Sequence, residues 1–214
     1  MSLGMILLLV VTVLLLFGVG QRVLDKLRLT DRQALLFTLL IFAGALVGDI
    51  PLGERLSVNL GGAVIPLALC VYLLIKAGTG KEKARALIAA VLSGAAVFLI
   101  GRYLPNEPEQ MPIDPNYLYG PAAGLIAFAL GRSRRSAFIA GVLGVILADV
   151  TQAVVNWTNG IDQRLVLGGA GVLDAVVLSG LIAVLLCELV GELTERAMRG
   201  AKPDGEFVRG EKRK

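Results

Sequence analysis

The sequence predicts an all-α polytopic membrane protein with seven transmembrane helices. Of its 214 residues, 56% are hydrophobic and 18% are charged, and the mean hydropathy is +0.75. Soluble domains contain about 45–50% apolar and about 25% charged residues, and disordered chains are less hydrophobic still. We therefore expect a multi-pass protein of the cell membrane, surrounded by the lipid bilayer and without a separate soluble domain.

Seven apolar segments supply the predicted spans, because a helix needs about 20 apolar residues to cross a bilayer. They cover residues 3–20, 33–52, 56–75, 84–104, 117–131, 136–156 and 165–190. The first lacks a positive leading region and a cleavage site, so we expect a retained helix rather than a signal peptide. The fifth is short and contains Pro121, so it forms either a full span or a re-entrant element.

Basic residues set the expected orientation. All of the 21 Lys and Arg residues except Arg55, Arg102 and Arg164 fall in alternate loops or in the tail after residue 190. Since positive loops stay in the cytoplasm, we expect the N-terminus outside and the C-terminus inside. Residues 1–190 would form one transmembrane domain, and residues 191–214 a charged cytoplasmic tail that begins as an extension of the last helix.

The composition also limits the chemistry. The chain has no histidine, which excludes histidine-based catalytic triads and most zinc sites. Cys70 and Cys187 lie in distant apolar segments, so we expect buried free thiols. We predict no cofactor and no metal site. The sequence pI of about 9.3 reflects membrane orientation rather than nucleic-acid binding.

A short motif hints at an internal repeat. Residues 60–63 and 167–170 both read Leu-Gly-Gly-Ala, and the segment before each contains an aspartate, Asp49 or Asp149. Two similar hairpins in the same orientation would give a 3+1+3 parallel repeat, an arrangement found among transporters. The shared composition of apolar helices is the alternative explanation.

Three acidic residues lie within the apolar segments: Asp49, Asp149 and Asp174. Counted at 1.5 Å per residue, Asp149 lies roughly 10 Å and Asp174 roughly 14 Å below the outer ends of two consecutive helices. A carboxylate at this depth is costly and normally faces the bundle interior or a wet cavity. These residues either form a functional site or a hydrogen-bonded pair that fixes helix packing.

Polar and small residues surround the three aspartates. Gln152 shares a helix face with Asp149, and Asn59 lies near Asp49 at the outer side, so both join the candidate solute- or ion-binding site. Small residues and proline permit close packing or an interrupted helix lining a cavity. The residues in question are Gly61, Gly62, Pro66, Gly168, Gly169 and Gly171.

Three segments carry a resemblance to a known family. They are NLGGAVIPL, AFIAGVLGVILAD and LGGAGVLDAVVLSGLIAVLL, within residues 59–186, and they resemble the bacterial and archaeal membrane family called domain of unknown function 1614. The resemblance implies that Asp149 and Asp174 are family aspartates. The residues before Asp149 are Leu147 and Ala148 where the family more typically reads Gly-Ala, and Val-Leu-Asp-Ala stands at 172–175 in place of Thr-Phe-Asp-Gly. The resemblance implies no activity.

Three functions remain open. The first is translocation of a small solute or a cation, with Asp149 and Asp174 as binding groups. The second is intramembrane aspartyl proteolysis, in which the two carboxylates share a proton and activate water, although two residues separate Gly171 from Asp174. The third is a non-catalytic scaffold. We favour translocation, and therefore a protein that is not an enzyme. A homo-oligomer is compatible with each.

Overall fold

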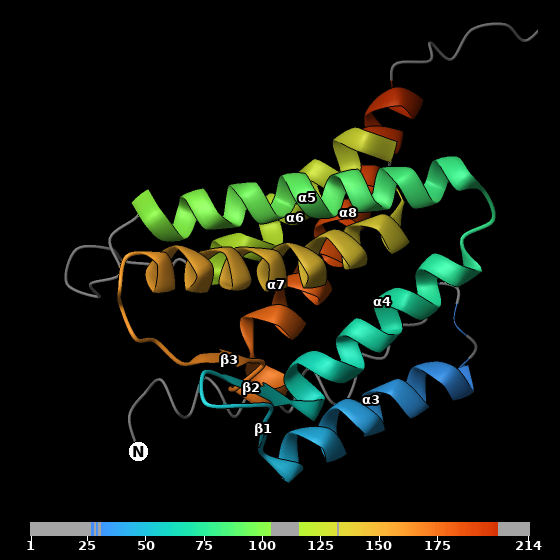
Figure 1. Ribbon diagram of the computed structural model, residues 1–214. Coiled ribbons are helices and arrows are strands. Elements are labelled where there is room, and N and C mark those ends of the chain that lie inside the picture. The colour runs from blue at the N-terminus through green and yellow to red at the C-terminus, as the bar shows by residue number, and fades with distance from the viewer. Residues whose placement is uncertain (1–26, 28, 30, 104–115, 132, 201–214) are drawn as a thin grey trace, which may run out of the picture.

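Helices α5 (Gly80–Tyr103), α6 (Asn116–Gly131), α7 (Arg134–Thr158) and α8 (Ala175–Gly200) pack against one another in the computed structural model (Figure 1). The structure describes residues 27, 29, 31–103, 116–131 and 133–200. The hydrophobic core draws on facing small and branched residues of these helices, among them Ala90, Ala140, Val142 and Val184, which are almost fully buried. Their burial removes apolar surface from water or lipid and fixes the helices relative to one another.

Helices α5 and α7 lie side by side and run in the same direction (Figure 1). A Cβ atom added at Gly144 would lie 2.8 Å from the Cβ of Ser93, and one at Gly94 would lie 3.0 Å from the Cβ of Leu147. Small residues at these positions let the two backbones approach closely. Ser133 is the N-cap of α7, and its side chain accepts a hydrogen bond from the Ser136 amide.

Helices α3 (Asp31–Val47) and α4 (Ile65–Lys76) form a second group beside the bundle (Figure 1). Helix α4 contacts α7, and the guanidinium of Arg135, in the first turn of α7, donates to the carbonyl oxygens of Leu27 and Lys76. Pro66 lies in the first turn of α4, which directly follows the π-helical turn Leu60–Val64.

A short three-stranded sheet joins the two groups, in the order β1 (Asp49–Pro51), β2 (Leu56–Asn59), β3 (Leu165–Leu167). Strands β1 and β2 are antiparallel, with Asp49 opposite Asn59. Strands β2 and β3 are parallel, with Val58 opposite Leu167. Helices dominate the described part of the chain, as the all-α prediction expects, and this short sheet is an element that the prediction did not include.

One predicted span ends earlier than its hydropathy indicates, and the helix of another begins later. Helix α3 stops at Val47 because Gly48 takes a left-handed φ of 83°, so Asp49 lies in a strand and not in the second span. The segment from Leu165 begins as β3, passes through the one-turn 3-10 helix η3 (Gly171–Leu173), and becomes α8 only at Ala175. Asp174 thus precedes the helix in which it was predicted.

Three helices of the described chain are long and apolar enough to cross a membrane: Gly80–Tyr103, Arg134–Thr158 and Ala175–Ala197. Shorter apolar helices cover Leu36–Val47, Leu60–Lys76 and Leu118–Leu130, and the last of these falls in the segment predicted as either a full span or a re-entrant element. These apolar helices indicate a membrane-embedded protein. The predicted first span at 3–20 and the end of the tail, 201–214, lie outside the described residues, whereas α8 continues to Gly200 as expected.

Candidate functional site

The candidate polar residues divide into two places. Asp149 and Gln152 line a cavity between α5, α6 and α7. Asp49, Asn59 and Asp174 lie instead around the strands and the glycine-rich turns. We call the first place the outer cavity, because it lies toward the end of α7 that the sequence predicts to face outward. The second, which we call the glycine junction, comprises residues 41–49 with Asn59, residues 60–63 and residues 167–174.

The outer cavity has a volume of about 580 Å³, within the range of about 300–1,000 Å³ that small-molecule sites occupy. Asp149 and Gln152 are one turn apart on α7, so both side chains reach the same space. Apolar and polar side chains share its wall. The lining residues are Val97, Phe98, Gly101, Arg102, Tyr103, Tyr119, Ala148, Asp149 and Gln152.

Asp149 differs from the other polar residues in its surroundings. In the described part of the chain, its carboxylate accepts no hydrogen bond and forms no ion pair, although its charge interacts with that of Asp174. A partly buried carboxylate without partners is unfavourable. This carboxylate is therefore available for a ligand in the cavity.

A chain of side-chain amides continues outward from the cavity along α7. Gln152 donates to the Asn156 side chain over 2.9 Å, and Asn156 donates in turn to the side chain of Gln163. The indole of Trp157 donates to the Gln163 carbonyl oxygen over 2.7 Å. These contacts fix the loop after α7 to the end of that helix, and they hold the Gln152 amide in place.

Arg102, Tyr103 and Tyr119 are cavity residues that the sequence did not reveal. The sequence offered no basic residue at the depth of Asp149, but the structure places Arg102 of α5 in the same cavity wall. The Tyr119 hydroxyl lies 3.3 Å from the position that a Cβ would take at Gly101. A usable signal was present, because Arg102 is the one basic residue in the otherwise acidic segment 101–116.

The glycine junction brings the two Leu-Gly-Gly-Ala segments into contact. The first forms the π-helical turn η2 (Leu60–Val64), and the second forms the turn between β3 and η3. A Cβ at Gly62 would lie 2.0 Å from the Gly168 oxygen, and one at Gly61 would lie 2.1 Å from the Ile41 oxygen. Neither backbone approach leaves room for a side chain.

The other small residues contribute unequally to the junction. A Cβ at Gly171 would lie 2.9 Å from the Cβ of Ala45, and Gly168 has a left-handed φ of 73°. Gly169 is exposed and a Cβ there would meet only the side chain of Val166 at close range. Close packing therefore accounts for Gly61, Gly62, Gly168 and Gly171.

Polar side chains hold the junction together. Asn59 donates from its side-chain amide to Asp49 over 3.1 Å, and its oxygen accepts from the Gly62 amide over 3.0 Å. Asp174 accepts from the Val176 amide over 2.9 Å and from the Ala170 amide over 3.2 Å. Asp174 is thus the N-cap of α8 and also closes the preceding turn.

The two places lie near each other. The charge of Asp174 interacts with those of both Asp149 and Asp49. Among the described residues, however, no three carboxylate or thiol groups come close enough together to hold a metal ion. Cys70 and Cys187 are buried and free, as predicted.

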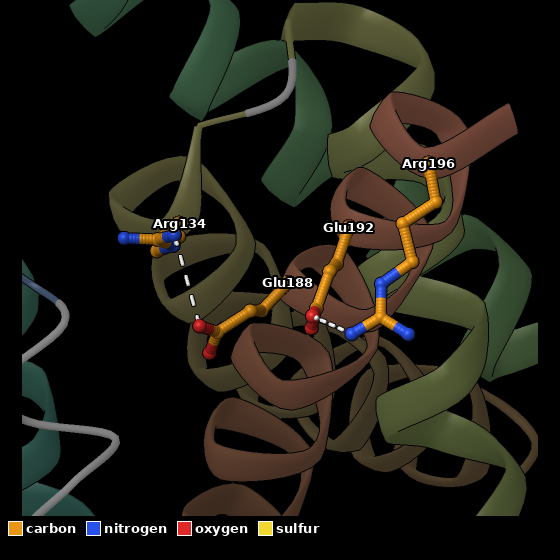
Figure 2. Close-up of polar contacts among 4 residues, drawn as sticks. All are labelled: Arg134, Glu188, Glu192 and Arg196. Atoms are coloured by element: carbon orange, nitrogen blue, oxygen red, sulfur yellow. Dashed lines mark hydrogen bonds and ion pairs between the residues drawn. The ribbon is translucent and has the colours of Figure 1, made fainter. Parts of the chain in front are cut away.

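The opposite end of the bundle contains charged pairs of another kind. The Arg134 guanidinium of α7 lies 3.7 Å from the Glu188 carboxylate of α8, and Arg196 pairs with Glu192 over 2.6 Å (Figure 2). Figure 2 shows Glu188 of α8 extended toward Arg134 of α7, whereas the Arg196 pair lies within α8. Arg134 and Arg196 are about half or more exposed, so these pairs form a charged rim rather than a buried site.

Comparison with known families supports the resemblance found in the sequence. The family model described as "Protein of unknown function (DUF1614)" matches residues 24–186. The chain belongs to this family. No curated protein and no solved structure matches it. The matched range contains the outer cavity and the glycine junction.

Proposed function

We propose that this protein binds a small polar solute or a cation in the outer cavity and moves it across the membrane. One observation carries the proposal: Asp149 lines a cavity of about 580 Å³ without a hydrogen-bond partner in the described chain. A carboxylate placed in an apolar helix is costly, and a bound cationic group would offset that cost. Gln152 and the tyrosine hydroxyls supply neutral polar contacts beside it.

We place the cavity on the outer side of a seven-span protein of the cell membrane, with the N-terminus outside and the C-terminal tail in the cytoplasm. The distribution of basic residues supports this orientation, since the arginine-rich end of α7 would then face the cytoplasm. The contact between the two Leu-Gly-Gly-Ala segments supports the 3+1+3 repeat, because repeats in transporters meet near the binding site.

Intramembrane proteolysis is the second candidate, favoured by the electrostatic interaction between Asp149 and Asp174. An aspartyl dyad needs both carboxyl groups free to share a proton and position water. Both oxygens of Asp174 accept backbone amides instead, and Asp174 does not line the cavity. This arrangement favours translocation over proteolysis. A scaffold role would not explain why an unpartnered carboxylate lines the cavity.

Uptake into liposomes tests the proposal. Purified protein is reconstituted, and uptake of radiolabelled rubidium, sodium and a mixture of the standard amino acids is compared with empty liposomes. We expect uptake of at least one probe, and a loss of about ten-fold or more in Asp149→Asn, as for a charged hydrogen bond removed. Glu54→Gln, an exposed change in the β1–β2 turn, should leave uptake unchanged.

Two results would overturn translocation. One is uptake no faster than in empty liposomes for all three probes, and the other is uptake that Asp149→Asn does not alter. Cleavage of a membrane substrate that stops in both Asp149→Ala and Asp174→Ala would establish proteolysis in its place.

A further inference from the structure

The outer cavity contains two opposite charges that do not neutralise each other. Asp149 and Arg102 both line it, yet they form no ion pair in the described chain. The charge that acts on Asp149 is that of Asp174, which does not line the cavity. An arginine close to a carboxylate normally pairs with it, so the spacing between the two groups calls for an explanation.

Helix geometry gives that spacing. Helices α5 and α7 run in the same direction, and Ser93 lies beside Gly144. Five residues further along each helix, Phe98 is therefore level with Asp149. Arg102 is one turn beyond Phe98, about 6 Å along the helix axis. Asp149 is half-buried and Arg102 is exposed, so the carboxylate lies deeper in the cavity and the guanidinium nearer its mouth.

Around the two charges, the cavity wall offers both apolar and hydrogen-bonding surface. Val97, Phe98 and Ala148 supply the apolar part, and Gln152 and Tyr119 supply the polar groups. A cation alone would use Asp149 and leave Arg102 as an unfavourable neighbour. A molecule with an ammonium group and a carboxylate group would satisfy both ends at once.

We propose, on the basis of the function above, that the solute is a small zwitterion of the α-amino acid class. Its ammonium group binds Asp149 in the depth of the cavity, and its carboxylate binds the Arg102 guanidinium at the mouth. Guanidinium matches carboxylate geometry with two parallel hydrogen bonds. Arg102 then decides between zwitterions and simple cations.

A binding experiment on purified protein tests the assignment. The thermal unfolding midpoint in detergent is measured with each of the twenty standard amino acids. The best binder is then compared with the amine that lacks its carboxylate and with the acid that lacks its amino group. We expect the amino acid to bind at least about ten-fold more tightly than either, since each removed charge leaves a cavity group unpaired.

Variants separate the two charges. Arg102→Gln should weaken amino-acid binding about ten-fold and leave binding of the amine unchanged, whereas Asp149→Asn should weaken both. Arg102→Lys should recover part of the affinity, and Arg85→Gln, an exposed change on the same helix, should have no effect. The unchanged amine binding shows that Arg102→Gln is folded.

The outcomes distinguish this assignment from translocation in general. The zwitterion would be overturned if the amine bound as tightly as the amino acid, if this binding depended on Asp149, and if Arg102→Gln did not change it. Cation translocation would then still be supported. Amino-acid binding by none of the twenty would also overturn the zwitterion. If rubidium, sodium and the amine do not bind, or bind without dependence on Asp149, both the zwitterion assignment and cation translocation are overturned.

Discussion

The outer cavity and the glycine junction each contain an aspartate of the apolar segments, but the two carboxylates have different surroundings. Asp174 accepts two backbone amides and caps α8. Asp149 lies in mid-helix, where every backbone amide is already bonded within the helix, and it faces a cavity. The comparison teaches that position relative to a helix end decides the use of a carboxylate: at an end it stabilises the fold, and in mid-helix it remains available for a ligand.

The largest effect should come from a side chain placed in the junction. Gly62→Val would put a Cβ 2.0 Å from the Gly168 oxygen, and backbone on both sides prevents relief. We expect loss of the folded protein, a change of more than about 4 kcal/mol, seen as aggregation in size-exclusion chromatography. Gly78→Ala, where a Cβ meets nothing within 4 Å, is the control. A monodisperse Gly62→Val protein would show that the segments do not touch.

Substitutions of the two aspartates should have different effects on the stability of the protein. Asp174→Ala removes an acceptor from two amides and should lower the free energy of unfolding by about 1–3 kcal/mol. Asp149→Asn removes no hydrogen bond of the described chain and replaces an unpartnered carboxylate, so it should leave the free energy of unfolding unchanged or raise it. Thermal unfolding in detergent measures both. Equal destabilisation by the two changes would erase the distinction between cavity and junction.

Two buried serines in the bundle show the same difference between a side chain with hydrogen-bond partners and one without. The Ser179 hydroxyl donates to the Gly141 oxygen over 2.8 Å, whereas the buried Ser93 hydroxyl has no partner in the described chain. Ser179→Ala should therefore cost about 1 kcal/mol, and Ser93→Ala should be neutral or stabilising. The unfolding midpoints of the two variants, compared with the unchanged protein, give the answer. A destabilised Ser93→Ala would mean that this hydroxyl has a partner in the membrane.

The smallest effect belongs to the charged rim. Arg134→Gln removes a 3.7 Å pair whose arginine is 48% exposed, and exposed pairs contribute about 0–1 kcal/mol. We expect a shift within that range, and a still smaller one in 0.5 M salt, which screens such pairs. A loss greater than that of Asp174→Ala would contradict the description of this end as a solvated rim.

Hydropathy and charge were sufficient for the helical, membrane-embedded character, and three sequence segments were sufficient for the family. Asp149 and Gln152, which the sequence placed on one helix face, line the same cavity, and their role as a binding site remains a prediction. Hydropathy and charge were insufficient for Asp49 and Asp174, because an apolar stretch does not distinguish a strand from a helix start. The left-handed conformations of Gly48, Gly168 and Gly171 decide that distinction, and they depend on contacts between distant segments.

Arg102 shows a second limit. Its place in the cavity wall depends on α5 lying beside α7 in the same direction, which brings a residue at the end of one helix into a cavity lined by the other. Loop charges predict on which side a helix ends, but not which helices are neighbours. The seven-span count and the orientation remain predictions.

The parallel pairing of β2 with β3 has a consequence for biosynthesis. More than a hundred residues separate Val58 from its partner Leu167, so the ribosome makes α4, α5, α6 and α7 before that edge of β2 finds its strand. During this time the backbone amide and carbonyl groups at the open edge of β2 need other hydrogen-bond partners, because an unpaired strand edge is unfavourable in lipid. The half-made chain must therefore keep this hairpin at the wet surface until β3 emerges, and only then can the junction close.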